Sequence, residues 1–215
     1  SATYNSGDIK IVGNITLPST ESTESTTNEI GNLEVASGIL TIETLHAENI
    51  TNKDFLEATI SLEANDILNE ENATVETPLA NVKGNLTDKY LFKGNVINFI
   101  GNIDQTFVPS AEELLVYPEI NVTKTSGTFT ATTNPLKVGT LNLESPENNF
   151  VQVIANFVNL TNAGNTTFEG NVTCNQNLTF TNATQTTFNE SVQIQSLTTE
   201  NSGKITFAKG GTIST

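Results

Sequence analysis

The sequence contains no arginine, tryptophan or methionine, and all nine of its basic residues are lysines. Against them stand 24 aspartates and glutamates, which give a formal net charge of −15 at pH 7. A nucleic-acid-binding protein needs lysine and arginine to neutralise phosphates, and anionic membrane surfaces attract basic segments. The composition therefore argues against nucleic acid as a partner and against binding to an anionic membrane surface.

Cysteine and histidine each occur once, as Cys174 and His46. A single cysteine forms no intrachain disulfide, and we expect Cys174 to point inward from a strand as a small apolar residue. One histidine and one cysteine are too few for a structural zinc site. A Ser–His–Asp triad would have to use His46, but no G-x-S-x-G motif exists, so we expect His46 at the surface.

Long apolar runs are also missing. No stretch reaches the roughly 18 apolar residues that a transmembrane helix needs, so we predict no transmembrane segment. The chain begins "SATYNSGDIKIVGN" without a methionine or a signal peptide, which predicts a mature or trimmed product.

Charge is distributed unevenly along the chain. Residues 1–120 contain 19 acidic residues and 5 lysines, whereas residues 121–215 contain 5 acidic residues and 4 lysines. This asymmetry predicts two regions with different surfaces.

We predict three segments. Residues 1–18 form an N-terminal extended segment that is a candidate donor strand. Residues 19–134 form an acidic β region, which opens with the apolar-free loop Ser19–Glu29. Residues 135–215, after the Thr-rich passage closed by Pro135, form a repeat-like Asn/Thr-rich β region.

Alternation of apolar and polar residues dominates the first half, as in "NLEVASGILTIETL" and "FLEATISLEA". Such alternation over strand-length runs is typical of β-strands. Ser110–Val116 is the exception, where Ser110 followed by two glutamates predicts a single helical turn.

The second half repeats itself. Phe150, Phe168, Phe188 and Phe207 follow one another at spacings of 18, 20 and 19 residues, each after short apolar pieces and polar corners. A period near twenty residues is typical of a solenoid, in which equivalent residues lie above each other at the strand spacing of about 4.8 Å. We therefore expect phenylalanine to stack on phenylalanine and asparagine on asparagine.

The predicted fold is all-β, a parallel β-solenoid (β-helix) with short irregular coils. The alternative is an antiparallel β-sandwich with donor-strand complementation, because a hairpin pair also uses about twenty residues.

Several phrases resemble passenger segments of secreted surface adhesins of the autotransporter and two-partner secretion type. They include "GNTTFEGNVT", "GNLEVASGILTIETLHAENIT" and "SGKITFAKGGTIST", with F-x-x-N elements at Phe92–Asn95, Phe99–Asn102 and Phe168–Asn171. The resemblance implies a β-helical rod that binds host or neighbouring cells.

By composition the chain also resembles the donor-strand subunits of archaeal surface filaments, which are rich in Asn, Thr and sequons and poor in Arg. That resemblance implies that "SATYNSGDIKIVGNITLP" completes a sheet of the next subunit, an arrangement known as strand addition.

The densest acidic stretch is "ANDILNEENAT", which contains Asp66, Glu70 and Glu71. Calcium takes six to eight oxygen ligands, so this stretch is either a solvated acidic loop or a weak calcium site formed by these three carboxylates. Calcium is the one cofactor that the sequence suggests.

Eleven N-x-S/T sequons make N-linked glycans a second expectation, and with them an extracellular location. The candidate asparagines are Asn14, Asn49, Asn72, Asn85, Asn121, Asn159, Asn165, Asn171, Asn177, Asn182 and Asn189.

The functional hypothesis is a secreted, non-enzymatic cell-surface structural protein, a subunit of an extracellular filament or sheath assembled with its own copies through β-strand or coil-end contacts. The first alternative is a rod-like adhesin passenger domain that binds a cell-surface receptor. The second is a β-helical polysaccharide-active enzyme, which needs two suitably placed carboxylates. No aspartate lies in the repeat-like half, which disfavours the enzyme.

Overall fold

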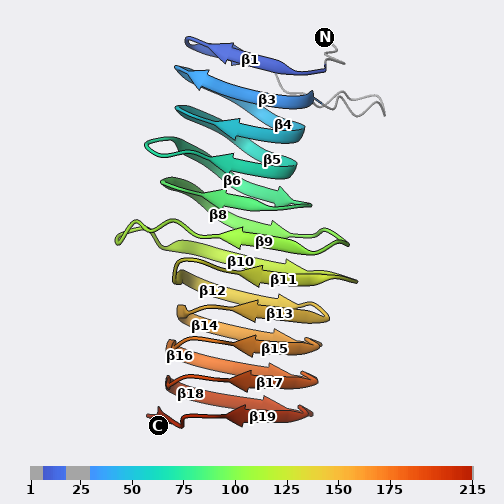
Figure 1. The fold of residues 1–215 in the computed structure, drawn as a ribbon, viewed down its shortest axis with the longest axis vertical. Coiled ribbons are helices and arrows are strands. Elements are labelled where there is room, and N and C mark those ends of the chain that lie inside the picture. Colours follow the sequence, from blue (N-terminus) through green and yellow to red (C-terminus); the bar gives the residue numbers. More distant parts are fainter. Residues whose placement is uncertain (1–6, 18–29, 215) are drawn as a thin grey trace.

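The computed structural model describes residues 7–17 and 30–214. These residues form twenty strands joined by turns and bends, without a helix among them. The strands wind into an elongated parallel β-solenoid of about ten turns, with the N-terminal coil at one end and the C-terminal coil at the other (Figure 1). The solenoid prediction is confirmed, and the antiparallel sandwich is wrong because every strand pair is parallel.

The strands, in chain order, are β1 (Ile9–Val12), β2 (Ile15–Leu17), β3 (Ile30–Ser37), β4 (Ile39–Asn52), β5 (Phe55–Asn69), β6 (Thr74–Val82), β7 (Leu86–Asp88), β8 (Leu91–Phe99), β9 (Gln105–Val108), β10 (Tyr117–Thr123), β11 (Thr128–Ala131), β12 (Leu136–Glu144), β13 (Glu147–Phe150), β14 (Val153–Thr161), β15 (Asn165–Phe168), β16 (Val172–Thr181), β17 (Gln185–Phe188), β18 (Val192–Glu200), β19 (Lys204–Phe207) and β20 (Gly211–Ile213).

Two stacks of strands form the walls of the solenoid. The first stack runs β1–β3–β4–β5–β7–β9–β11–β13–β15–β17–β19. The second runs β2–β4–β5–β6–β8–β10–β12–β14–β16–β18–β20. The long strands β4 and β5 contribute to both stacks, so these two coils pass continuously from one wall to the other.

One inward column of the first stack runs from the first coil to the last. Its members, in register order, are Ile9, Leu33, Ile50, Ile67, Leu86, Phe107, Ala131, Phe150, Phe168, Phe188 and Phe207. Nine of these side chains are buried, and only the two end members, Ile9 and Phe207, are partly exposed. The alternating pattern of each strand therefore produces one continuous core rather than separate clusters.

Phenylalanine replaces the aliphatic residues of this column in the second half. The rings of Phe150 and Phe168 have centroids 5.2 Å apart, those of Phe168 and Phe188 are 4.8 Å apart, and those of Phe188 and Phe207 are 5.0 Å apart. The last two pairs are nearly parallel, with interplanar angles of 3° and 5°. The predicted phenylalanine stack is confirmed, and its spacing follows the distance between adjacent strands.

Coil length varies along the axis. Leu33, Ile50 and Ile67 are each separated by 17 residues, Phe107 and Ala131 by 24, and the coils beyond Phe150 by 18 to 20. The acidic half is thus part of the same solenoid, with shorter and then longer coils. Pairing of β10 with β12 and of β11 with β13 continues the ladder past Pro135 without a break.

Corners between strands depend on glycine and asparagine. A Cβ atom at Gly164, Gly170 or Gly203 would overlap a carbonyl oxygen of the preceding coil, so these positions have no room for a side chain. Another corner column, Asn162, Asn182 and Asn201, has φ values of 51°, 54° and 49°. Asparagine is one of the few residue types that adopts this left-handed conformation readily.

Two predictions concern the N-terminal part of the chain: the extended segment 1–18 and the loop Ser19–Glu29. Within residues 1–18, β1 pairs with β3 and β2 with β4 of the same chain, so these strands form the first described coil rather than a free donor strand. The rest of that segment, and the loop Ser19–Glu29, lie outside the described residues.

The predicted helical turn at Ser110–Val116 is wrong. This segment is a loop that projects from the side of the solenoid between β9 and β10 (Figure 1). Its one tight turn is closed by the Leu115 amide, which donates to the Glu112 carbonyl. Ser110 does accept a hydrogen bond from the Glu112 amide at 3.2 Å, but its own amide and hydroxyl are committed to Tyr117 and Tyr90, which pulls the chain away from a helix.

The phenyl stack makes a quantitative prediction. Phe168→Ala removes a fully buried ring that contacts rings in both adjacent coils, and we expect it to lower the free energy of unfolding by about 3–5 kcal/mol. Phe157→Ala is the matched control, since Phe157 is 38% exposed on the outer wall, and it should cost under about 1 kcal/mol. Chemical unfolding followed by circular dichroism measures both, and equal losses would contradict a packed stack.

Corner packing makes a second prediction. Gly170→Ala places a methyl group on the carbonyl oxygen of Val151, so one coil must shift against the next. We expect a loss of about 1–3 kcal/mol in the free energy of unfolding. Gly7→Ala, where a Cβ meets no atom within 4 Å, should leave stability almost unchanged. A neutral Gly170→Ala would show that the coils are free to separate at this corner.

Candidate functional site

The groups that could bind another molecule or react lie in three places. These are outward columns of polar side chains, a polar network inside the solenoid, and the open end of the last described coil. Each arises from the parallel register, which brings equivalent positions of successive coils into contact.

The asparagine ladder is an outward column on the second stack, formed by Asn81, Asn98, Asn121, Asn142 and Asn159. Each asparagine after Asn81 donates its Nδ2 to the Oδ1 of the asparagine one coil earlier, at 2.7–2.9 Å. The predicted stacking of asparagine is confirmed. Because the three inner amides both donate and accept along the column, the ladder ties five coils together from outside.

A second outward column, the threonine column, lies on the first stack. Its members are Thr106, Thr130, Asn149, Thr167, Thr187 and Thr206. β-branched threonine suits an exposed strand, and both columns are uncharged. Each of the two columns is therefore a regular, uncharged, hydrogen-bonding surface.

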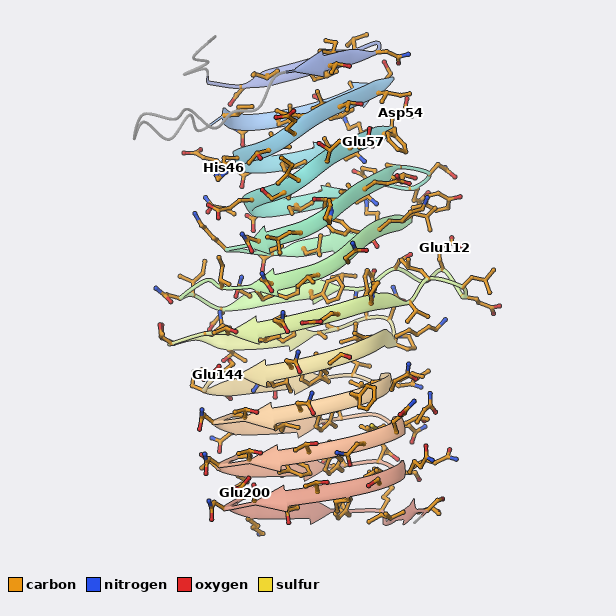
Figure 2. The ribbon with its side chains drawn as sticks, turned by 180° about the vertical axis from the view of Figure 1, so that it is seen from behind. His46, Asp54, Glu57, Glu112, Glu144 and Glu200 are labelled. Atoms are coloured by element: carbon orange, nitrogen blue, oxygen red, sulfur yellow. The ribbon has the colours of Figure 1, made fainter. Side chains whose placement is uncertain are left out.

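The acidic half carries ion pairs between coils instead. Glu34 lies between Lys10 and Lys53, at 3.4 and 2.8 Å, and its hydrogen bond with Lys53 lowers the Glu34 pKa. Figure 2 shows the labelled acidic side chains projecting outward from the coils, with Glu112 on the protruding loop. These exposed pairs stabilise the register only slightly.

His46 lies half-exposed on the outer wall, as expected. Its Nδ1 is 3.7 Å from Glu63 Oε1, and Lys83 Nζ contacts the same oxygen at 2.5 Å. The shallow groove beside these three residues has a volume of about 80 Å³. It is too small for the 300–1,000 Å³ typical of a ligand pocket, and no serine or cysteine belongs to it.

The calcium candidates are not brought together into one cluster. Asp66 accepts a hydrogen bond from the Asn85 amide, while Glu70 forms an ion pair with Lys89 at 2.6 Å. Glu71 lies exposed in the turn after β5. In residues 7–17 and 30–214, no three His, Cys, Asp or Glu side chains are grouped so as to hold a metal ion.

Inside the solenoid lies a polar network that sequence reasoning missed. Asn52 donates to Asn69, and Asn69 donates to Asp88, both at 2.9 Å. Tyr117 donates its hydroxyl to Asp88 Oδ2 at 2.7 Å. All four side chains are at most 1% exposed, so strand alternation alone would have placed apolar residues here.

Asp88 is the centre of this network. Its carboxylate accepts four hydrogen bonds, two from these side chains and two from the amides of Tyr90 and Phe92. Burial nevertheless raises the pKa of Asp88 above its ordinary value of 3.8, and burial together with the Asp88 charge raises the pKa of Tyr117 well above 10. The saturated geometry marks a structural role, because every acceptor site is already used by the fold.

Lys124 is the second buried ionisable group. Its Nζ donates to the carbonyls of Gly101 and Ile103 and to Gln105 Oε1, at 2.9, 2.6 and 2.8 Å. Burial lowers the pKa of the Lys124 amine, and the charge of Asp104 opposes that shift. Three acceptors saturate the ammonium group, which closes a corner of the coil from within.

Cys174 is buried in β16, as predicted. Burial raises the pKa of its thiol, which leaves the group protonated and unreactive at neutral pH.

The open C-terminal coil is formed by β18, β19 and β20. In the described part of the chain, β19 pairs only with β17 and β20 only with β18. An apolar groove of about 240 Å³ follows this end, lined by Val192, Ile194, Phe207 and Ile213. Ile213 is 46% exposed, and Phe207 is the only partly exposed ring of the stack.

Comparisons with known proteins add no assignment: no protein-family model, curated protein or solved structure matches the chain. In the described residues, the structure contains no helix with the length and apolar character needed to cross a bilayer.

The buried carboxylate makes a pH prediction. Since the folded pKa of Asp88 is raised, the fold binds this proton more tightly than the unfolded chain does. The stability that Asp88 contributes should then be largest below pH 3.8 and decline as the pH rises through the folded pKa. A ¹³C NMR titration of the Asp88 carboxyl should give a midpoint above 3.8. A midpoint below that value would mean that the four donors outweigh burial.

Proposed function

We propose that this chain is a non-enzymatic structural protein of the cell surface, a rigid subunit of an extracellular filament or sheath that joins its own copies end to end. The observation that carries the proposal is the C-terminal coil, where no other described residue covers the strand edges or the inner phenylalanine column.

Exposed strand edges are templates for pairing with another chain, and most proteins block them with charges, proline or a covering element. Strands β18–β20 contain no proline, and the inward residues that line the groove, Val192, Ile194, Phe207 and Ile213, are apolar. This edge is therefore suited to a further β-coil, since main-chain hydrogen bonds and apolar burial would act together.

The first described coil of a second copy has the matching form. β1 pairs only with β3 and β2 only with β4 among the described residues, so their other edges face along the axis. If Ile9 of one copy follows Phe207 of another, β1 adds to β19 and β2 to β20, with all strands still parallel. A head-to-tail contact of this kind does not close on itself and builds a filament.

Charge supports the same register. When Ile9 of one copy follows Phe207 of the other, Asp8 of the first copy follows Thr206 of the second in the outward column. Asp8 then lies beside Lys204 of that second copy. Asp8 already accepts from Asn32 Nδ2 at 2.8 Å within its own chain, so its carboxylate is held at the surface of the first coil. The contact would thus place a lysine near an aspartate rather than two acidic groups face to face.

Hydrogen bonding and composition support the other two parts of the proposal, the non-enzymatic role and the extracellular location. A non-enzymatic role fits the saturated hydrogen bonding of Asp88 and Lys124, which leaves both groups committed to the fold. A location outside the cell fits the eleven sequons and the acidic surface.

The test is assembly of the 215-residue chain. Wild-type protein should form fibres in negative-stain electron microscopy and large species in light scattering. Phe207→Asp combined with Ile213→Asp puts two charges into the apolar end groove and should abolish fibres. Ile60→Asp is the control, because Ile60 is 58% exposed on the side of the solenoid, and it should leave assembly intact.

A milder variant distinguishes a blocked contact from unfolding of the last coil, which the two introduced charges of the double variant could cause. Lys204→Glu changes an exposed side chain and should slow assembly while the circular dichroism spectrum stays unchanged. Wild-type protein that remains as single short rods would refute end-to-end joining and favour the rod-like adhesin alternative. Fibres formed by the double variant would locate the contact elsewhere.

A further inference from the structure

The eleven sequon asparagines fall into two structural classes. N-linked glycans attach at the side-chain nitrogen of asparagine, so the state of each Nδ2 atom decides whether a glycan fits the folded chain. The structure separates asparagines whose Nδ2 is used by the fold from those whose Nδ2 is free.

Six sequon asparagines donate Nδ2 to another side chain at 2.7–3.2 Å. They are Asn49, Asn121, Asn159, Asn177, Asn182 and Asn189. Asn121 and Asn159 belong to the asparagine ladder, and Asn177 donates to Thr179, the hydroxyl residue of its own sequon. Five of the six are only half-exposed.

The other five sequon asparagines are all exposed, and their Nδ2 atoms have no acceptor among the described residues. They are Asn14, Asn72, Asn85, Asn165 and Asn171. Asn14 and Asn85 are held through the opposite atom, since Oδ1 accepts from the amides of Ile39 and Thr106 at 3.0 and 2.8 Å. The side chain is thus oriented while its nitrogen stays available.

Corners explain most of this second class. Asn14 lies between β1 and β2, Asn72 in the turn between β5 and β6, and Asn171 between β15 and β16. Asn72 has a φ of 65°, so it lies at a turn where the chain bends away from the wall. A sugar attached at such a corner extends into solvent without passing over a neighbouring coil.

Ladder positions offer no such space. Asn121 has Asn98 and Asn142 in register on either side, one strand spacing of about 4.8 Å away. A sugar on its Nδ2 would replace one hydrogen of the donating amide and would have to leave the column between these two side chains.

We propose that Asn14, Asn72, Asn85, Asn165 and Asn171 carry N-linked glycans and that the six fold-committed sequons do not. The donor would be a lipid-linked sugar phosphate: a bond forms between Nδ2 and the sugar C1, and the bond from C1 to the phosphate oxygen breaks. The lipid phosphate leaves with that electron pair, and the amide loses one proton. This inference rests on the extracellular location within the proposed function.

Glycopeptide mass spectrometry of protein purified from its source organism tests the assignment. Sugar masses are expected on peptides that contain Asn72 and Asn171, and peptides with Asn121 and Asn159 should have their unmodified mass. Expressed in the same organism, N72Q/N171Q should lose two glycans from the intact mass, whereas the matched pair N121Q/N159Q should lose none.

Sugar on Asn121 or Asn159, or no sugar on any of the five exposed asparagines, would overturn the assignment. Either failure is separable from failure of the proposed assembly. Fibres built from unglycosylated chains would refute only the glycan sites, while glycosylated chains that stay as single rods would refute only end-to-end joining.

Discussion

Parallel in-register pairing is the constraint on which the rest of this structure depends. Since every strand pair is parallel, each side chain lies directly above its equivalent in the next coil, and a residue must be compatible with itself at about 4.8 Å. Phenylalanine meets that condition inside by stacking its rings, and asparagine meets it outside because one amide both donates and accepts. Glycine meets it at corners, where the carbonyl of the previous coil takes the place of a side chain.

Charged residues fail the same condition, since like charges in adjacent coils repel. The acidic half meets the difficulty by placing a lysine between or beside its glutamates, as Lys93 pairs with Glu76 at 2.7 Å and Lys53 with Glu34 at 2.8 Å. Glu57 and Glu76 are the exception, in register on adjacent coils, with Thr41 donating to Glu57 from the other side. The second half avoids charge on its walls almost entirely. The two halves of one continuous solenoid thus avoid repulsion between adjacent coils in different ways. The acidic half uses ion pairs, and the second half uses mostly uncharged side chains.

Sequence alone predicted what repeats and missed what occurs once. The spacing of Phe150, Phe168, Phe188 and Phe207 is visible in the letters, so the solenoid and its phenyl stack followed from it. In the acidic half the same column is filled by Leu33, Ile50 and Ile67, and no distinctive residue marked the period.

The sequence did not identify Asn52 and Asn69 as core residues, because asparagine in a strand normally faces water. Only the register of the strands shows that Asn69 donates a hydrogen bond to Asp88, which also accepts one from Tyr117. A faint signal did exist, since Asn52, Asn69 and Asp88 are the last residues of β4, β5 and β7, at spacings of 17 and 19 residues.

The same register also decides how such a rod can associate with others. The net charge of −15 is concentrated in the acidic half, so in-register side-by-side approach brings the like charges of that half together, and salt screens them only beyond about 10 Å. End-on approach exposes only one coil of each copy to the other. At that end the inward column finishes in a partly exposed Phe207 and the outward one in Thr206, so apolar burial and main-chain hydrogen bonds act with little opposing charge. Corner glycans would add bulk to the sides and leave the strand edges free. Charge and packing therefore favour the proposed growth along one axis, the axis that the coils already define, and the proposed corner glycans would not oppose it.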